Sequence, residues 1–251
     1  MSNTTTNTAH HRLNVDAHLG PLHLDAQLHL AAPWTVIFGP SGSGKSSLLR
    51  AACGLLSHNK SHPCFSFCPS RSNPDTPSEW TTLDSTATHM RKLGYAPQGA
   101  VLFPHLSVRE NIAFAATAQH IAATSQQLIS EAIDLFELTP LTNRMPRDLS
   151  GGERQRVNLA RAFAVPSARL LLLDEPFTGI DRGLRDTLLP RMQQHIAKLG
   201  IPVISVTHDV EEALLLNAEV IRIEQGAVIA QGSAAEVLAA ERTSILQTLH
   251  R

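Results

Sequence analysis

A glycine-rich segment early in the chain has the residue types that bind a chain of phosphates. It runs from Gly39 to Ser46, fits the pattern G-x-x-x-x-G-K-[ST], and follows a short apolar stretch that predicts a strand. Its glycines allow several backbone N–H groups to face one anion, and the next helix adds the positive end of its dipole. Lys45 is expected to reach the β- and γ-phosphates, and the Ser46 hydroxyl to ligate Mg²⁺. The predicted nucleotide-binding residues of this phosphate loop are Gly39, Pro40, Ser41, Gly42, Ser43, Gly44, Lys45, Ser46 and Ser47.

Two adjacent carboxylates follow an apolar run much later in the chain. Leu170–Leu173 predicts a buried strand, and Asp174 and Glu175 come directly after it. A strand of this kind delivers a magnesium ligand beside the nucleotide in phosphate-loop enzymes. Asp174 is therefore expected to hold the Mg²⁺ shell, and Glu175 to accept a proton from the attacking water. The presence of Lys45 in the same chain disfavours both a chance glycine-rich turn and a merely solvated acidic pair.

A third segment predicts a second anion site. Leu149–Arg156 reads LSGGERQR, in which Ser150 is an N-cap and Glu153 follows at the spacing of a capping box. The exposed N–H groups of such a helix start attract anions. This segment lies far along the chain from Lys45, beyond an inserted helical region. The simplest arrangement is two copies placed head to tail, each presenting Ser150, Gly151 and Gly152 to the nucleotide held by the other.

Hydrophobic periodicity indicates the elements that position these segments. Apolar and polar residues alternate at 13–19 and at 22–30 around a Gly20-Pro21 turn, which predicts an antiparallel hairpin. Helix and strand patterns alternate after residue 150, as parallel sheets require. The other expected elements are a strand at 35–38, a helix at 45–56, loops with one or two weak strands at 57–90, strands at 170–173 and 203–206, and a hairpin around 225–226.

Helix starts are indicated where Ser or Thr is followed three residues later by Glu or Gln. No repeat is visible, and no linker divides the chain into independent domains. The sequence therefore predicts one α/β domain over residues 1–251, with a helical region at about 100–165. The four expected starts are Ser107 with Glu110, Thr124 with Gln127, Ser150 with Glu153, and Ser233 with Glu236.

The composition excludes several classes of protein. The chain has 251 residues with 43% hydrophobic and 17% charged, which excludes a disordered or fibrous chain. The formal net charge of −1 argues against a general nucleic-acid binder, so no nucleic-acid partner is expected. The longest apolar runs fall far short of the roughly 18 residues of a membrane helix. With a polar N-terminus and an odd number of cysteines, the expectation is a soluble cytosolic protein without a disulfide framework.

The motifs together resemble the nucleotide-binding subunit of ATP-binding cassette (ABC) transporters, from about Leu13 to Leu238. LSGGERQR carries this resemblance most specifically, because phosphate-loop kinases and GTPases lack it. The resemblance implies further site residues. Gln98, in Tyr-Ala-Pro-Gln, corresponds to a glutamine that contacts Mg²⁺ and the attacking water. Asp181, in Thr-Gly-Ile-Asp, belongs to a loop that links the two active sites, and His208 corresponds to a histidine that contacts the γ-phosphate.

The resemblance implies a P-loop NTPase fold with a RecA-like core, an N-terminal antiparallel β subdomain and an inserted α-helical subdomain. It implies binding and hydrolysis of ATP with Mg²⁺ by a head-to-tail dimer of such subunits. The implied partners are an integral membrane permease and, indirectly, a substrate-binding protein. The expected location is therefore peripheral, on the cytoplasmic face of the cell membrane. The length leaves no room for the C-terminal regulatory domain of longer relatives.

Residues 102–111, with 188–190 and 200–202, look most like the ATPases of molybdate (oxyanion) importers. An importer for another substrate is an alternative, because the membrane and binding proteins select the substrate. A non-transport ABC ATPase is a second alternative, disfavoured by the absence of heptads, zinc modules and a second cassette.

Two further regions are candidates for contacts with the permease and with the adenine base of ATP. Residues 99–106 and adjacent helices are expected to form a groove for a permease helix, with ordinary core packing of the apolar loop as the alternative. The family usually stacks an aromatic residue on adenine, but residues 11–24 offer only histidines. Trp34 stands too close to the phosphate loop, so His18 is the candidate.

Overall fold

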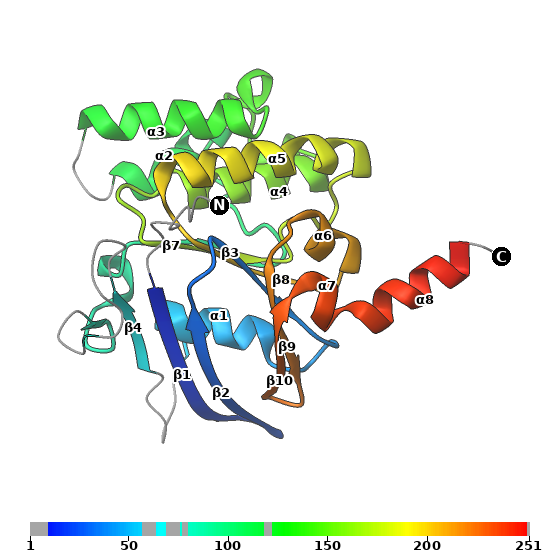
Figure 1. Ribbon diagram of the computed structural model, residues 1–251. Helices are drawn as coiled ribbons and strands as arrows, with labels where there is room; N and C mark the ends of the chain where they lie inside the picture. Colours follow the sequence, from blue (N-terminus) through cyan, green and yellow to red (C-terminus); the bar gives the residue numbers. More distant parts are fainter. Residues whose placement is uncertain (1–9, 57–63, 69–75, 77–79, 118–121, 250–251) are drawn as a thin grey trace, which may run out of the picture. The chain divides into compact units, whose positions relative to one another are not determined.

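The computed structural model describes residues 10–56, 64–68, 76, 80–117 and 122–249 (Figure 1). The chain divides into two compact units, which are described separately. Unit 1 comprises residues 1–91 and 204–251, and unit 2 comprises residues 92–203. The described helices include none that is both long and apolar enough to cross a membrane.

Unit 1 is built on a mixed sheet that begins with the expected hairpin. Strands β1 (His10–Leu19) and β2 (Leu22–Leu30) pair antiparallel, with Leu13 opposite Leu28. Alternate side chains of both strands are buried, so the prediction from alternation is confirmed. The strand order in the unit is β5-β4-β1-β2-β10-β9-β3-β8. The other strands are β3 (Trp34–Phe38), β4 (Cys64–Cys68), β5 (Thr81–Thr82), β8 (Val203–Thr207), β9 (Glu219–Glu224) and β10 (Ala227–Ser233).

The expected strands at 35–38 and 203–206 and the hairpin at 225–226 are all present in these elements. The expectation of weak strands within 57–90 is confirmed by β4 and β5, while residues 57–63, 69–75 and 77–79 lie outside the described part of the chain. The helices of unit 1 are α1 (Lys45–Cys53), the 3-10 turn η2 (Thr88–Met90), α6 (Val210–Leu215), α7 (Ala234–Val237) and α8 (Ala239–Leu249).

Helix α1 ends three residues earlier than expected. Gly54 adopts a left-handed conformation with φ 72°, and its N–H bonds to the last turn, which terminates the helix. A Cβ at Gly54 would lie 2.7 Å from the Arg91 guanidinium, so a larger residue there would displace that side chain. The following residues, 55–56, are not helical.

Unit 2 combines two parallel strands with four helices. Strand β6 (Leu93–Ala96) pairs with β7 (Leu170–Asp174), and Ala96 lies opposite Leu173. Helix α4 packs against both strands and against α2 and α3. The expected strand at 170–173 is confirmed. The helices are α2 (Val108–Thr117), α3 (Ala122–Leu135), α4 (Gly151–Phe163) and α5 (Arg182–Leu199), with 3-10 turns η3 (Thr139–Leu141) and η4 (Pro146–Asp148).

Three of the four expected capping boxes are present. Ser107 with Glu110, Ser150 with Glu153 and Ser233 with Glu236 each make the reciprocal bonds of the motif. The fourth expectation is wrong, because α3 begins at Ala122 and Thr124 lies inside it. The Gln127 amide donates instead to Glu131 Oε1, one turn ahead, at 2.8 Å.

Candidate functional site

The phosphate loop lies in unit 1, between β3 and α1, in the strand–loop–helix context that its sequence predicts. Residues 39–44 form the connection, and Lys45, Ser46 and Ser47 form the first turn of α1. Gly42 and Gly44 have φ of 80° and 100°, a region that glycine enters without strain. A Cβ at Gly39 would overlap the carbonyl of Ile223 in β9. The glycines are thus required both by conformation and by close packing.

Two polar side chains of the loop show that it fits a phosphate ligand. Lys45 is buried, and its Nζ donates to the carbonyls of Gly39 at 2.8 Å and Pro40 at 2.9 Å. Its charge is therefore held over the loop. The buried Ser43 Oγ has no hydrogen-bond partner among the described residues. A buried hydroxyl without a partner is costly, and an anion in the loop would accept a hydrogen bond from it.

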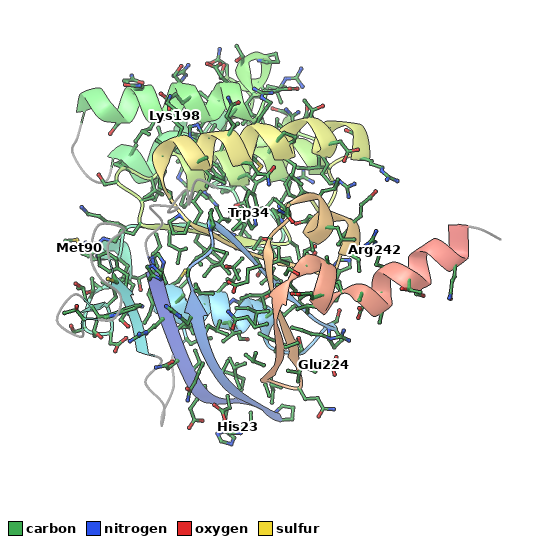
Figure 2. The ribbon with its side chains drawn as sticks, in the orientation of Figure 1. His23, Trp34, Met90, Lys198, Glu224 and Arg242 are labelled. Carbon is green, nitrogen blue, oxygen red and sulfur yellow. The ribbon has the colours of Figure 1, made fainter. Side chains whose placement is uncertain are left out.

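A pocket of about 470 Å³ adjoins the phosphate loop within unit 1. His23 lies at the turn end of the β1–β2 hairpin (Figure 2) and lines this pocket, whereas His18 does not. The two imidazole rings stack with centroids 4.3 Å apart, and His23 Nε2 lies 2.8 Å from Asp16 Oδ1. The complete lining is Pro21, Leu22, His23, Pro40, Ser41, Gly42, Ser43 and Gln225.

Trp34 is not available to a ligand. Its side chain is 5% exposed, and its indole N–H donates to Ser205 Oγ at 2.9 Å. His23, with His18 stacked on it, therefore supplies the aromatic surface among the residues that line this pocket. The sequence offers His11, His18 and His23 in this region, with His18 as the candidate. Alternation along a strand does not show which ring faces a neighbouring loop, and the structure has His23 lining the pocket.

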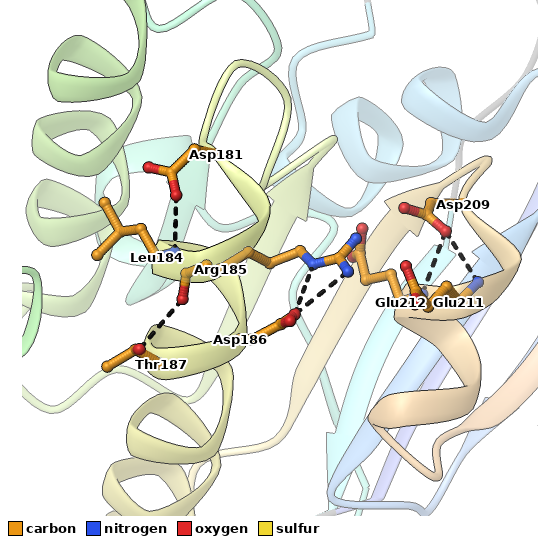
Figure 3. Close-up of polar contacts among 9 residues, drawn as sticks. Asp181, Leu184, Arg185, Asp186, Thr187, Asp209, Glu211 and Glu212 are labelled. Atoms are coloured by element: carbon orange, nitrogen blue, oxygen red, sulfur yellow. Dashed lines mark hydrogen bonds and ion pairs between the residues drawn. The ribbon is translucent and has the colours of Figure 1, made fainter.

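His208 lies in unit 1 between β8 and α6. It is exposed and directly precedes Asp209, the N-cap of α6. The Asp209 carboxylate accepts hydrogen bonds from the N–H groups of Glu211 and Glu212 (Figure 3). The Thr207 hydroxyl donates to Glu212 Oε2 at 3.0 Å and accepts from the N–H of Asp209. The backbone on both sides of His208 is thus fixed, which sets where its side chain emerges.

The predicted acidic and amide residues gather at one edge of unit 2. Gln98 comes shortly after β6, Asp174 is the last residue of β7, and Glu175 directly follows it. The two strand ends are adjacent, because Ala96 lies opposite Leu173. Asp174 is 1% exposed, whereas Gln98 is exposed. The carboxyl ends of parallel strands are where sheets of this kind carry their chemistry. The structure therefore brings these three side chains to the same edge.

Glu175 has an unusual backbone conformation. Its φ is 51°, in the left-handed region that non-glycine residues seldom adopt. The Thr178 hydroxyl donates a hydrogen bond to Glu175 Oε2 at 3.4 Å, and the Gln155 side-chain amide donates one to the Glu175 backbone carbonyl at 3.2 Å. Strained conformations of this kind are held by their surroundings and are common at functional sites.

The LSGGERQR segment forms the exposed start of α4. Ser150 and Gly151 are exposed, and a Cβ at Gly151 would meet no atom within 4 Å. Hydrogen bonds from the backbone N–H and the hydroxyl of Ser150 lower the pKa of the Glu153 carboxyl. The Ser150 hydroxyl also accepts one bond from the Glu153 N–H, at 3.3 Å. Gly152 packs closely on the Gly179 carbonyl.

Asp181 serves as the N-cap of α5. Its carboxylate accepts a hydrogen bond from the Leu184 N–H at 2.9 Å (Figure 3), and its side chain is exposed.

The predicted site residues are divided between the two units. Unit 1 holds the phosphate loop and His208. Unit 2 holds Gln98, Ser150, Gly151, Gly152, Asp174, Glu175 and Asp181.

The loop at 101–104 borders a groove of about 410 Å³ in unit 2. Val101 of this loop and Phe114 of α2 are 67% and 48% exposed, so this part of unit 2 presents apolar side chains at a groove. Its use as the seat of a permease helix stays a prediction. The rings of Phe103 and Phe114 are 4.3 Å apart, and Arg161 lies over the Phe103 ring at 5.5 Å. Burial lowers the pKa of the Arg161 guanidinium. The lining is Leu93, Tyr95, Pro97, Val101, Leu102, Phe103, Phe114, Arg161, Ala162 and Val165.

Comparison with solved structures supports the fold. The chain is similar to a protein described as "Structure of ATP binding subunit of ABC transporter", with a TM-score of 0.74 at 22% identity over 92% of both chains. This likeness concerns the fold alone. The expected α/β fold of a P-loop NTPase, with its antiparallel N-terminal strands and inserted helices, is confirmed.

Curated relatives are importer subunits with different named substrates. The chain is 38% identical to the molybdenum import ATP-binding protein ModC of Rhodopseudomonas palustris, over 87% of this chain and 57% of ModC. It is 39% identical to the Fe(3+) ions import ATP-binding protein FbpC of Pseudomonas fluorescens, over 81% and 54%. It is 37% identical to the probable sulfate/thiosulfate import ATP-binding protein CysA of Chlorella vulgaris, over 80% of each. The chain thus spans little more than half the length of the first two relatives.

The family profile described as "ABC transporter" matches residues 27–178, which include the phosphate loop, the LSGGERQR helix start and the paired carboxylates. The resemblance that the motifs indicate is therefore confirmed by an independent match over more than half of the chain. The chain belongs to the ABC transporter family.

Proposed function

We propose that this chain is the ATP-binding and ATP-hydrolysing subunit of an ABC importer. The observation that carries the proposal is a capped, exposed helix start at Ser150 in a chain that also has a phosphate loop. Lys45 would exchange its bonds to the Gly39 and Pro40 carbonyls for bonds to phosphate oxygens. Ser46, Gln98 and Asp174 have the oxygen donors that Mg²⁺ prefers, and the ion would neutralise phosphate charge there.

Glu175 would take the proton from the attacking water, and His208 would contact the γ-phosphate. Ser150, Gly151 and Gly152 of one copy would bind the nucleotide of a second copy, and Asp181 would lie at the junction between the sites. The exposed start of α4 and the positive end of its dipole support this role. The whole chain would act as one nucleotide-binding domain, as expected for residues 1–251.

A direct test is the hydrolysis of MgATP by the purified chain. We expect turnover in the wild type, and Lys45→Met should weaken ATP binding by roughly 10- to 100-fold because charge-assisted bonds are lost. Lys198→Met, at an exposed residue of α5 (Figure 2), is the matched control and should bind ATP normally. Absence of turnover in the wild type, or an unchanged affinity in Lys45→Met, contradicts the proposal.

The groove beside residues 101–104 would receive a helix of an integral membrane permease, which would hold the chain at the cytoplasmic face of the membrane. Its exposed apolar residues, Val101 and Phe114, support a partner surface. A substrate-binding protein would act only through that permease.

Molybdate or a related oxyanion is the proposed cargo, supported by the similarity to ModC. Uptake of molybdate, sulfate and ferric iron in cells lacking this chain separates the candidates. Loss of molybdate uptake alone is expected, and loss of iron uptake alone would reassign the cargo.

The nucleotide base would stack on His23. Base–aromatic stacking contributes roughly 1–3 kcal/mol, so His23→Ala should weaken ATP binding by about 5- to 150-fold. His23→Tyr keeps an aromatic face and should bind within a few-fold of wild type, by the same argument. His18→Ala, which removes the ring stacked on His23 but not lining the pocket, should have the smaller effect. Fluorescent ATP titration checks this, and a larger loss in His18→Ala would contradict it.

A further inference from the structure

Four residues of α4 contact the two loops of unit 2 that follow β7 and β6. We define them as the α4 stripe: Gly152, Gln155, Asn158 and Arg161. Residues three apart are neighbours on a helix surface, so each member of the stripe adjoins the next, and the stripe winds around α4 from Gly152 to Arg161. With a rise of 1.5 Å per residue it extends about 14 Å along the helix axis. Gly152, at one end, lies beside the proposed nucleotide contact at Ser150, and Arg161, at the other end, lines the groove.

The first half of the stripe holds the loop that follows β7. Gly152 packs on the Gly179 carbonyl, where a Cβ would lie only 2.7 Å from the oxygen. The Gln155 amide donates to the carbonyls of Glu175 at 3.2 Å and Pro176 at 2.9 Å. Gln155 is 4% exposed, so these bonds are made away from water. They fix the two carbonyls next to the strained φ of Glu175.

The second half holds the loop that follows β6. Asn158 is fully buried, and its amide donates to the Pro97 carbonyl at 2.9 Å, directly before Gln98. Arg161 donates to the Val101 carbonyl at 2.8 Å and to Asn158 Oδ1 at 3.1 Å. The last two residues of the stripe are therefore joined to each other. Arg161 also lies over Phe103 in the groove.

A buried polar group that loses its hydrogen-bond partner is costly. The backbone carbonyls bonded to Gln155, Asn158 and Arg161 are therefore expected to move together with α4. A displacement at Val101 or Phe103 is carried by Arg161 to Asn158 and the backbone of Gln98. A displacement of the α4 start is carried by Gln155 to the backbone of Glu175. Packed elements shift between discrete arrangements rather than deforming gradually.

We infer that the α4 stripe is the connection through which a helix seated in the groove sets the orientation of Glu175 and Gln98. Gln155, Asn158 and Arg161 are positioning residues that act through the backbone of the two loops. This inference rests on the proposed ATP hydrolysis, and it assigns the control of that reaction to residues that contact no substrate. The stripe joins the loops that follow β7 and β6 to the start of α4 and to the groove.

The test uses the full-length chain and steady-state hydrolysis of MgATP. Gln155→Met and Asn158→Leu keep side-chain size but remove the donated bonds. We expect kcat to fall roughly 10- to 100-fold, because a misplaced catalytic group loses rate while substrate binding persists. KM for ATP should stay within about twofold of wild type for the same reason. Gln126→Met, at an exposed residue of α3, is the control and should match wild type.

The double variant Gln155→Met with Arg161→Met distinguishes a connected stripe from separate packing defects. When residues act as one unit, the effects of two substitutions on kcat do not multiply. The kcat of the double variant should therefore lie within about twofold of the kcat of the slower single variant. Arg161 is partly exposed, and Arg161→Met carries the test if a buried variant does not fold. The inference is overturned if the kcat losses of the two single variants multiply in the double variant. It is also overturned if the wild type hydrolyses ATP and the folded variants keep the wild-type kcat. A wild type without turnover overturns the proposed function instead.

Discussion

Replacement of Glu175 by glutamine is expected to preserve ATP binding while lowering turnover by at least about 100-fold. A positioned general base contributes a factor of this size, and the amide cannot accept a proton at neutral pH. The substitution keeps the shape of the side chain, and the backbone bonds from Gln155 to the Glu175 and Pro176 carbonyls remain. Nucleotide titration and steady-state hydrolysis on the same preparation measure both parts of the expectation.

Glu131→Gln provides the matched control for this variant. Glu131 lies on α3 in the same unit, and its carboxylate accepts a bond from Gln127. The control should hydrolyse ATP at the wild-type rate. Near-normal turnover in Glu175→Gln would show that another group takes the proton from water, and the assignment of Glu175 would then be wrong.

Substitution of Ser150 by arginine is expected to abolish hydrolysis without weakening ATP binding to a single chain. In the head-to-tail arrangement, Ser150 contacts only the nucleotide of the other copy, and a long cationic side chain at this position keeps the copies apart. Loss of the N-cap also costs about 1 kcal/mol of stability, so a lower melting temperature accompanies the effect. The decisive comparison is therefore between hydrolysis and single-chain nucleotide affinity.

The chain offers a matched control in its C-terminal capping box. Ser233 caps α7 with the same reciprocal bonds to Glu236 that Ser150 makes with Glu153. Ser233→Arg should lose a cap of the same kind and keep its hydrolysis rate. Equal loss of hydrolysis in the two variants would mean that destabilisation, and not a missing nucleotide contact, causes the effect.

Local chemistry accounts for the features that the sequence predicts well. Alternation at 13–19 and 22–30 reports burial of one sheet face, and this pattern is enough to predict the β1–β2 hairpin. Capping boxes at Ser150 and Ser233 depend on residues three positions apart, so they are also visible in the sequence. The phosphate loop is predictable for the same reason, because its glycines and Lys45 act within a few residues.

Features that depend on contacts between distant segments escape such reasoning. Gln155 and Asn158 appear in sequence as ordinary polar residues of a helix, but their partners lie in loops that follow two different strands. The start of α3 at Ala122 shows that a Thr with a following Gln is not always a capping box, because the Gln side chain can bond forward. His18 and His23 are both histidines of the same hairpin in the sequence, and only the structure shows that His23 lines the pocket beside the phosphate loop.

The most direct test of the central claim is the mass of the Glu175→Gln chain in solution with saturating MgATP, measured by light scattering. Two copies that enclose ATP between the phosphate loop of one and Ser150 of the other should double the mass of the single 27.2 kDa chain. ADP, or the added Ser150→Arg substitution, should return the mass to that of one chain. A mass of one chain in saturating MgATP, with ATP bound, contradicts the claim.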